Sequence, residues 1–345
     1  MTKKRTKDVA LVLSSGGARG IAFIGAIEEL ESRGYNITSV AGCSMGALIG
    51  GVYAAGGLEA FKEWLFSLND IGIMSLVDPS ISKNYLVKGD KVISAIKEIV
   101  PNINIQDLKI PFSAVATDLY TGEEVVFREG PLFEAIRASI SVPSFFRPVK
   151  NGHRTLIDGG LVNTLPLNRV ARNGHDILIG FDVNDIDKDG INAFLEQMYR
   201  LNKNMTVYKN DTMSYIGKLG KKKDVSLLEK IREVGGRGID LFRLQKDTAS
   251  KQKKLIAESA KKRIPVGAED SYLSILKRSF SIANHVIADR MIEACPPDVL
   301  ARLPLDAVPS GMAYAKGREL SEIGRHLMAD ALDRYEKSST EYAEL

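Results

Sequence analysis

The chain contains little cysteine and no excess of charge of one sign. Its 345 residues include two cysteines, which are too few for a disulfide framework or a cysteine-rich metal site and favour a reducing, cytoplasmic setting. With 47 basic and 43 acidic residues, the formal net charge is +4. So mild a balance does not indicate nucleic-acid binding, and it is compatible with loose attraction to an anionic membrane surface.

Long apolar runs are also missing. No stretch approaches the roughly 20 apolar residues that a membrane span needs. The first apolar run, Val9–Leu13, is too short for the core of a secretory signal, and no small-residue cleavage site follows it. We therefore expect no signal peptide and no transmembrane segment, and a cytoplasmic protein that contacts membranes only peripherally, from the aqueous side.

Short apolar runs instead alternate with helical patterns. Val9–Leu13 is continuously apolar, which is typical of a buried parallel strand, and residues 21–33 then carry apolar side chains at helical spacing. Residues 40–43 and 45–55 repeat the strand and the helix. This alternation predicts an α/β fold whose mainly parallel central sheet is flanked by helices.

The pattern indicates a single domain with an insertion. Its core covers about residues 8–183. Over about residues 187–270 lysines cluster and apolar residues fall at helical spacing, which predicts a helical insertion or cap. Helical patterns over about residues 271–335 close the domain.

The sharpest local motif is Gly42-Cys43-Ser44-Met45-Gly46, with a predicted strand before it and a predicted helix after it. It matches the Gly-x-Ser-x-Gly nucleophile elbow, in which the glycines leave the serine hydroxyl accessible and the helix N-terminus favours an oxyanion. A glycine-rich turn with a helix-capping serine would give the same five residues. Ser44 is therefore the candidate nucleophile.

The second motif lies between the first strand and its helix and reads Ser14-Ser15-Gly16-Gly17-Ala18-Arg19-Gly20. Successive glycines let backbone N–H groups point at one anion. A dinucleotide-binding fingerprint needs glycine where Ser15 stands, and a P-loop needs a Gly-Lys-Ser/Thr ending that this segment lacks. An oxyanion loop is the interpretation that remains.

The third motif, Asp158-Gly159-Gly160, follows a short apolar run and by itself is a common Asp-Gly turn. Histidine is the more usual general base, so a Ser–His–Asp triad is the alternative to a base at Asp158. Two of the four histidines lie in Asn-Gly turns and a third lies in a long amphipathic helical pattern, which makes the triad the less favoured interpretation. The four are His153, His175, His285 and His326.

Taken together, these motifs resemble those of the bacterial patatin-like phospholipases. The resemblance covers roughly residues 8–183, and the segments that carry it are residues 13–25, 40–50, 112–117, 136–143 and 158–160. The sequence departs from the family at Ser15, where glycine is usual, and at Cys43, where threonine is common. Neither departure removes a reacting group.

The resemblance implies a patatin-like fold and a Ser–Asp dyad that works without histidine. Ser44 would be the nucleophile, Asp158 its base, and the backbone N–H groups of Gly16 and Gly17 would hold the oxyanion. Arg19 would steady the glycine loop or bind a lipid phosphate, or it would form only a structural salt bridge. The expected activity is hydrolysis of fatty-acyl esters, of the phospholipase A or carboxylesterase type. A catalytically quiet acyl-binding or regulatory protein of the same fold is the alternative.

A fourth pattern concerns calcium. Asp185, Asp187, Asp189 and Glu196 fit the EF-hand loop consensus, yet a predicted strand rather than a helix precedes them, so a solvated acidic loop is the alternative. We expect hydrolysis to require no metal or other cofactor, because backbone N–H groups can stabilise the oxyanion. The expected partner is a lipid or acyl-ester substrate and not nucleic acid. The head group, the acyl chain and the oligomeric state stay open.

Overall fold

The computed structural model describes residues 7–68, 72, 76, 87–186, 272–305 and 316–341. The chain divides into two units, of which one combines Met1–Met198 with Arg278–Leu345 and the other is Tyr199–Lys277. The elements discussed below belong to the first unit, apart from the first residues of helix α10. The insertion expected over residues 187–270 lies outside the described residues.

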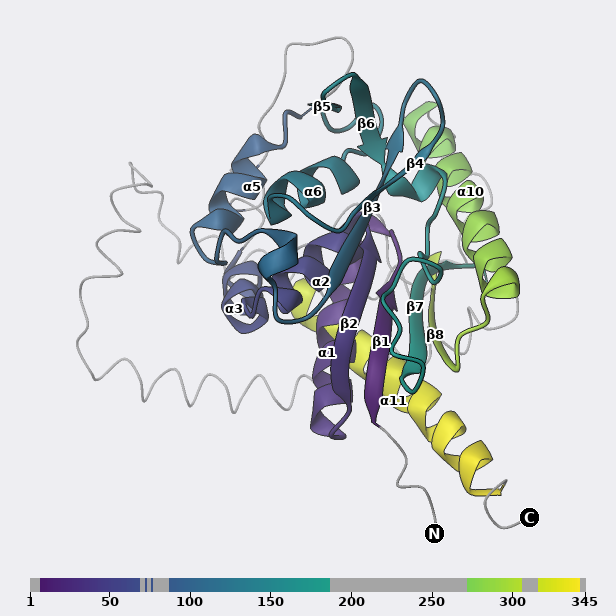
Figure 1. The fold of residues 1–345 in the computed structure, drawn as a ribbon. Coiled ribbons are helices and arrows are strands. Elements are labelled where there is room, and N and C mark those ends of the chain that lie inside the picture. The colour runs from purple at the N-terminus through teal and green to yellow at the C-terminus, as the bar shows by residue number, and fades with distance from the viewer. Residues whose placement is uncertain are drawn as a thin grey trace, which may run out of the picture. The chain divides into compact units, whose positions relative to one another are not determined.

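An eight-stranded sheet forms the centre of the first unit (Figure 1). Its strand order is β5-β6-β3-β2-β1-β7-β8, and β4 pairs with β3. In that order, β3, β2, β1, β7 and β8 run parallel to one another. Strands β4 and β6 each pair with β3 in the antiparallel direction, and β5 pairs antiparallel with β6. The predicted α/β fold is therefore confirmed, with a sheet that is mixed overall. The strands are β1 Asp8–Leu13, β2 Asn36–Cys43, β3 Phe112–Asp118, β4 Glu124–Phe127, β5 Val149–Asn151, β6 Arg154–Asp158, β7 Ile177–Asp185 and β8 Val299–Pro304.

Helices flank the sheet (Figure 1). The α-helices are α1 Ala22–Ser32, α2 Met45–Ala54, α3 Leu58–Ser67, α5 Asp90–Lys97, α6 Leu132–Ser139, α10 Tyr272–Ala294 and α11 Gly317–Glu341, and the short 3-10 helices are η1 Gly17–Ile21, η2 Ile105–Asp107 and η3 Gly159–Leu161. Helix α11 crosses α1 closely, because a Cβ on Gly25 would lie only 1.8 Å from the backbone oxygen of Ser321. No helix among the described residues is sufficiently long and apolar to cross a bilayer.

Side chains of the central strands are buried on both faces, as expected for an interior parallel strand. On one face Ala10 and Val12 of β1 pack with Ala288 of α10, in a cluster that includes Leu165, Leu167 and Val170. On the other face the rings of Phe23 in α1 and Phe181 in β7 meet edge to face, 5.3 Å apart. Strand β1 thus lies at the centre of the core.

The strand order reverses at β1. From β1 the chain continues to β2 and β3 on one side, and later returns to β7 and β8 on the other. Loops that leave the carboxyl ends of β1 and β2 therefore lie beside each other at a topological switch point, where open α/β sheets form their ligand crevice.

Candidate active site

Ser44 occupies the sharp turn between β2 and α2. Its backbone angles are φ 54° and ψ −118°, which a residue with a side chain rarely adopts. Strain of this kind persists where the surrounding structure enforces it, and it matches the geometry of a nucleophile elbow. The turn places the Ser44 side chain beyond the end of the strand, at the N-terminus of a helix.

The two glycines of the motif are required by close backbone contacts. A Cβ on Gly42 would lie 2.3 Å from the backbone oxygen of Gly46, and a Cβ on Gly46 would lie 2.2 Å from that of Leu13. The spacing Gly-x-Ser-x-Gly is therefore a packing requirement at this turn. The backbone N–H of Ser44 donates to Ser139 Oγ at 2.8 Å, and Ser139 Oγ donates to the Val115 carbonyl at 2.6 Å. This chain of bonds ties the elbow to α6 and β3.

The glycine loop lies next to the elbow because β1 and β2 are in register at their ends, with Leu13 opposite Gly42. Gly17 is in the left-handed region at φ +56°, and a Cβ built on it would have no atom within 4 Å. Gly17 is also the first residue of η1, so its N–H has no partner within that helix. Among the described residues, the N–H groups of Gly16 and Gly17 donate no hydrogen bond.

Strand register brings Ser44 and Asp158 together across β3. Cys43, the residue before Ser44, ends β2 and pairs with Val115. On the other side of β3, Ala116 pairs directly with Asp158. Although 114 positions separate Ser44 and Asp158 in the sequence, they lie on the two sides of β3, next to its consecutive residues Val115 and Ala116.

Asp158 is 1% exposed and ends β6. Its Oδ1 accepts the Gly160 N–H at 2.8 Å, which caps η3, while Oδ2 is buried without a hydrogen-bond partner among the described residues. Burial raises the pKa of Asp158 from 3.8 to about 6, although the Ser44 hydroxyl and the Gly160 N–H act in the opposite direction. A buried carboxylate therefore lies close enough to the Ser44 hydroxyl for that hydroxyl to lower its pKa.

Cys43 contributes to the same buried environment. Its thiol lies 4.0 Å from Asp158 Oδ1. Burial, together with the neighbouring carboxylate, raises the pKa of this thiol well above its usual range. The group is therefore a neutral thiol at physiological pH, and it adds no second anion beside Asp158.

Arg19 connects the glycine loop to the end of β7. Its Nε donates to the Val183 carbonyl at 2.8 Å, and its Nη2 donates to Asn184 Oδ1 at 3.3 Å. Asn184 in turn donates through Nδ2 to the Ser15 carbonyl at 2.7 Å. These bonds hold both ends of the loop against one strand, which is the geometry of a loop-steadying residue.

The structure adds Asn284 of α10 to the site, which no sequence motif singled out. Asn284 is 4% exposed, and its Nδ2 donates to Ser15 Oγ at 3.2 Å. The sequence hints at its position only because Asn284 lies four residues, or about one helical turn, before Ala288, which is also buried. Ser139, which anchors the elbow, was part of the segment that resembles the family but had no role assigned.

The four histidines lie apart from this arrangement. His153 and His175 are exposed, whereas His285 pairs with Asp289 at 3.3 Å and His326 lies 4.0 Å from Glu322. In the described part of the chain, no hydrogen bond or ion pair joins a histidine to Ser44 or Asp158. The geometry therefore favours Asp158 as the group that faces the serine.

Only one member of the calcium pattern is described. Asp185 ends β7, and its Oδ1 accepts from Arg302 Nη1 at 3.1 Å. Asp187, Asp189 and Glu196 lie outside the described residues. Within the described residues, no group of three or more potential metal ligands comes together.

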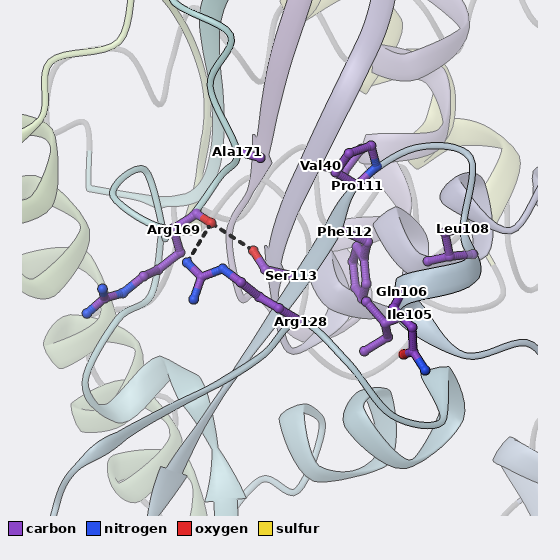
Figure 2. Close-up of a pocket in the computed structure, with 10 residues that line it drawn as sticks. All are labelled: Val40, Ile105, Gln106, Leu108, Pro111, Phe112, Ser113, Arg128, Arg169 and Ala171. Carbon is purple, nitrogen blue, oxygen red and sulfur yellow. Dashed lines mark hydrogen bonds between the residues drawn. The ribbon is translucent and has the colours of Figure 1, made fainter.

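A cavity of about 270 Å³ lies elsewhere, at the amino end of β3 (Figure 2). Pro111, Phe112 and Ser113 form part of its lining, with Arg128 and Arg169 across from them. Phe112 precedes Ala116 by four strand residues, or roughly 13 Å at 3.3 Å per residue. This cavity is therefore separate from the Ser44–Asp158 site.

Residues 11–171 match the family described as patatin-like phospholipase. An uncharacterized NTE family protein of Mycobacterium tuberculosis is 47% identical over 176 residues, which cover 51% of this chain and 49% of that protein. Patatin-like phospholipase domain-containing protein 6 of Mus musculus is 29% identical over 194 residues, covering 54% of this chain and 14% of that protein. Among solved structures, VipD from Legionella pneumophila is 14% identical with a TM-score of 0.41, over 95% of this chain and 67% of that chain. The match thus spans about half the length of this Mycobacterium tuberculosis relative.

Proposed function

We propose that this protein is a lipid acyl hydrolase in which Ser44 is the nucleophile and Asp158 its general base, which agrees with the match of residues 11–171 to the patatin-like phospholipase family. One observation carries the assignment. A strained, buried serine lies directly after the partner of Val115, and a buried carboxylate whose pKa the serine hydroxyl lowers pairs with Ala116, on the other side of β3.

The first step is attack by Ser44 on the acyl carbonyl of an ester. Asp158 takes the hydroxyl proton while Ser44 Oγ bonds to the carbonyl carbon. With a pKa of about 6, Asp158 is mostly ionised at neutral pH and is a stronger base than an exposed aspartate. The N–H groups of Gly16 and Gly17 hold the oxyanion that forms on the carbonyl oxygen. The alcohol leaves with the proton from Asp158, and the acyl group stays on Ser44.

The second step is hydrolysis of the acyl-enzyme. Asp158 takes a proton from water as the water oxygen attacks the acyl carbon. The bond from that carbon to Ser44 Oγ then breaks, the proton returns to Ser44, and the carboxylic acid departs. Arg19 acts on both steps indirectly, by fixing the loop that carries the oxyanion donors.

We propose fatty-acyl esters as the substrate class, taken from a membrane that the protein contacts peripherally in the cytoplasm. The mechanism draws its electrostatic stabilisation from backbone N–H groups, so no metal or other cofactor takes part. Calcium at the acidic loop beginning with Asp185 would affect the stability of that loop and not the chemistry.

The proposal is tested with a soluble short-chain p-nitrophenyl ester and a fluorophosphonate probe. Ser44→Ala and Asp158→Asn should each lower turnover by at least about 10⁴-fold, because residues that act as a unit lose nearly all catalysis when one is removed. Labelling by the probe should disappear in Ser44→Ala. Activity should persist in EDTA, and circular dichroism checks that each variant is folded.

Substitution of each histidine by glutamine provides the control, and we expect modest losses only. A folded histidine variant as inactive as Ser44→Ala would replace the dyad by a triad. A folded wild-type protein whose Ser44 neither reacts with the probe nor hydrolyses esters would instead be a quiet acyl-binding protein of the same fold.

A further inference from the structure

The end of α6 and the residues just after it contact both members of the proposed dyad. Ser139, the last residue of α6, accepts the Ser44 N–H through its Oγ at 2.8 Å. Two residues later, the carbonyl oxygen of Ser141 accepts the Asp158 N–H at 2.9 Å. Both serines of this segment are fully buried. One short piece of chain therefore holds the backbone of the nucleophile and the backbone of the base.

The bond to Asp158 is needed because β6 extends beyond its neighbour. Strand β5 pairs with Arg154 to Leu156 of β6 and ends before Asp158 is reached. A buried N–H left without an acceptor costs about 1–3 kcal/mol. The Ser141 carbonyl takes the place of the missing strand, and it therefore helps to fix the backbone from which the Asp158 carboxylate extends.

Arg137 in turn fixes Ser141. Ser141 Oγ donates to the Arg137 carbonyl at 2.7 Å and accepts from Arg137 Nη1 at 2.7 Å, so one residue both receives and supplies a hydrogen bond of this hydroxyl. The second nitrogen of the guanidinium, Nη2, donates to the Arg147 carbonyl at 2.9 Å and also to the Lys88 carbonyl. Arg137 thus holds both ends of residues 141–147, a segment in which Ser144 has a strained φ of 65°.

An arginine in this place costs stability that its donors must offset. Arg137 is 8% exposed, and burial lowers its pKa below the ordinary value. Its ion pair with Asp90 is long, at 3.6 Å from Nε, and the Asp90 side chain is 51% exposed. Because an apolar side chain of similar volume would avoid the loss of hydration, the oriented hydrogen bonds to Ser141 and Arg147 are what the arginine adds.

We propose that Arg137 is a positioning residue for the general base. It acts through Ser141 and holds Asp158 at the distance from the nucleophile that proton transfer requires. Ser139 provides the fixed point on the other side, since its Oγ also donates to the Val115 carbonyl of β3 at 2.6 Å. This assignment rests on the proposed function and adds a residue on which the reaction depends indirectly.

The test measures kcat and KM with a soluble short-chain p-nitrophenyl ester. In Arg137→Met the Ser141 hydroxyl loses its guanidinium partner, and we expect kcat to fall about 10–100-fold with little change in KM. The physical reason is that a displacement of about 1 Å at a reacting group can cost about 10²-fold in rate. Ser141→Ala breaks the same link with a smaller change, and it should show a similar loss even if Arg137→Met does not fold.

The double variant shows whether the two residues act along one path. If Arg137 acts through Ser141, adding Arg137→Met to Ser141→Ala should lower kcat little further, whereas independent effects would multiply. Arg33→Met is the matched control, because Arg33 is also partly buried and joins α1 to α11 through its ion pair with Asp333 at 2.6 Å. This control should lose stability and keep the wild-type kcat.

A wild-type kcat in folded Arg137→Met or Ser141→Ala overturns the assignment. So does a double variant whose loss equals the product of the two single losses, or a loss that appears in KM and not in kcat. Failure of the proposed function is recognised separately. In that case Ser44→Ala would hydrolyse the ester as fast as the wild-type protein, or the wild-type protein would not hydrolyse it.

Discussion

The two ends of β3 make a useful comparison. At its amino end, the cavity in Figure 2 is lined by two arginines and a serine whose polar groups are paired with one another or with neighbours. Ser113 Oγ and Arg128 Nη2 both donate to the Arg169 carbonyl, at 3.0 and 3.2 Å, and Arg169 Nε donates to Glu124 at 2.9 Å. At its carboxyl end, the site around Ala116 keeps unpaired oxygens on two buried side chains.

The two regions differ in whether their buried polar groups are hydrogen-bonded, and the volume of a cavity does not reveal this difference. Paired polar groups contribute to stability and leave nothing to bind a reacting molecule. Unpaired groups reduce stability unless a ligand uses them. We therefore expect substitutions at the carboxyl end to change catalysis strongly, and substitutions at the cavity to change only stability.

The largest effect that would sharpen this contrast is expected at Gly17. Gly17→Ala adds a methyl group in open space above the loop and strains a left-handed residue, which turns an oxyanion donor away or blocks the oxyanion. Loss of one donor typically lowers kcat by about 10²–10³-fold, with little change in KM. The measurement is steady-state kinetics on a soluble ester.

Gly34→Ala is the control for this strain. Gly34 also has a positive φ, +73°, with no atom near its Cβ position. The two variants should lose similar stability, and only Gly17→Ala should lose activity. Near-normal kcat in folded Gly17→Ala would show that the loop does not form the oxyanion hole.

A second expected effect concerns stability and pH. Because the folded pKa of Asp158 is raised to about 6, the stability that its carboxyl group contributes is present below about pH 4 and is lost as the pH rises through 6. An asparagine side chain at this position would stay neutral throughout, so Asp158→Asn should be inactive yet more stable above pH 6, by up to about 3 kcal/mol for a shift of about two pKa units. Urea unfolding at pH 4, 6 and 8 measures this gain.

Asp176→Asn should show the opposite sign. Burial by itself raises the pKa of Asp176. The Asn173 N–H and the Arg172 guanidinium lower it by more, so the pKa lies below its usual range. Its carboxylate therefore stabilises the fold at neutral pH, and the asparagine variant should be less stable there, with a difference that shrinks in acid. A loss of stability at pH 8 for Asp158→Asn would contradict the view that the active site carries an unpaired buried charge.

The smallest effect is expected at the cavity. Arg169→Met removes the ion pair with Glu124, which is partly exposed and is worth up to about 1 kcal/mol. The free energy of unfolding should fall by that amount, while kcat and KM stay unchanged. A loss of activity as large as that of Gly17→Ala, in a folded protein, would mean that the two ends of β3 are functionally coupled and that our comparison is wrong.

Much of the fold was predictable from the sequence because its signals are local. Continuous apolar residues over 9–13 indicated a buried parallel strand, and β1 is indeed buried on both faces. The glycines around Ser44 indicated a tight strand-to-helix turn, and contacts of 2.2–2.3 Å at their Cβ positions explain why no other residue fits. The two loops meet because parallel strands deliver their carboxyl ends to one edge.

Other features were decided only by the tertiary structure, because they depend on register and on contacts between distant segments. The position of Asp158 opposite Ser44 follows from the pairing of β2, β3 and β6, which no local pattern specifies. Its raised pKa follows from burial, which depends on every element packed around it. Asn284 is an ordinary helix residue in the sequence, and it became part of the site only because α10 packs against the glycine loop. The sequence by itself determined which groups could react, and the packing of β6 and α10 decided which of them meet.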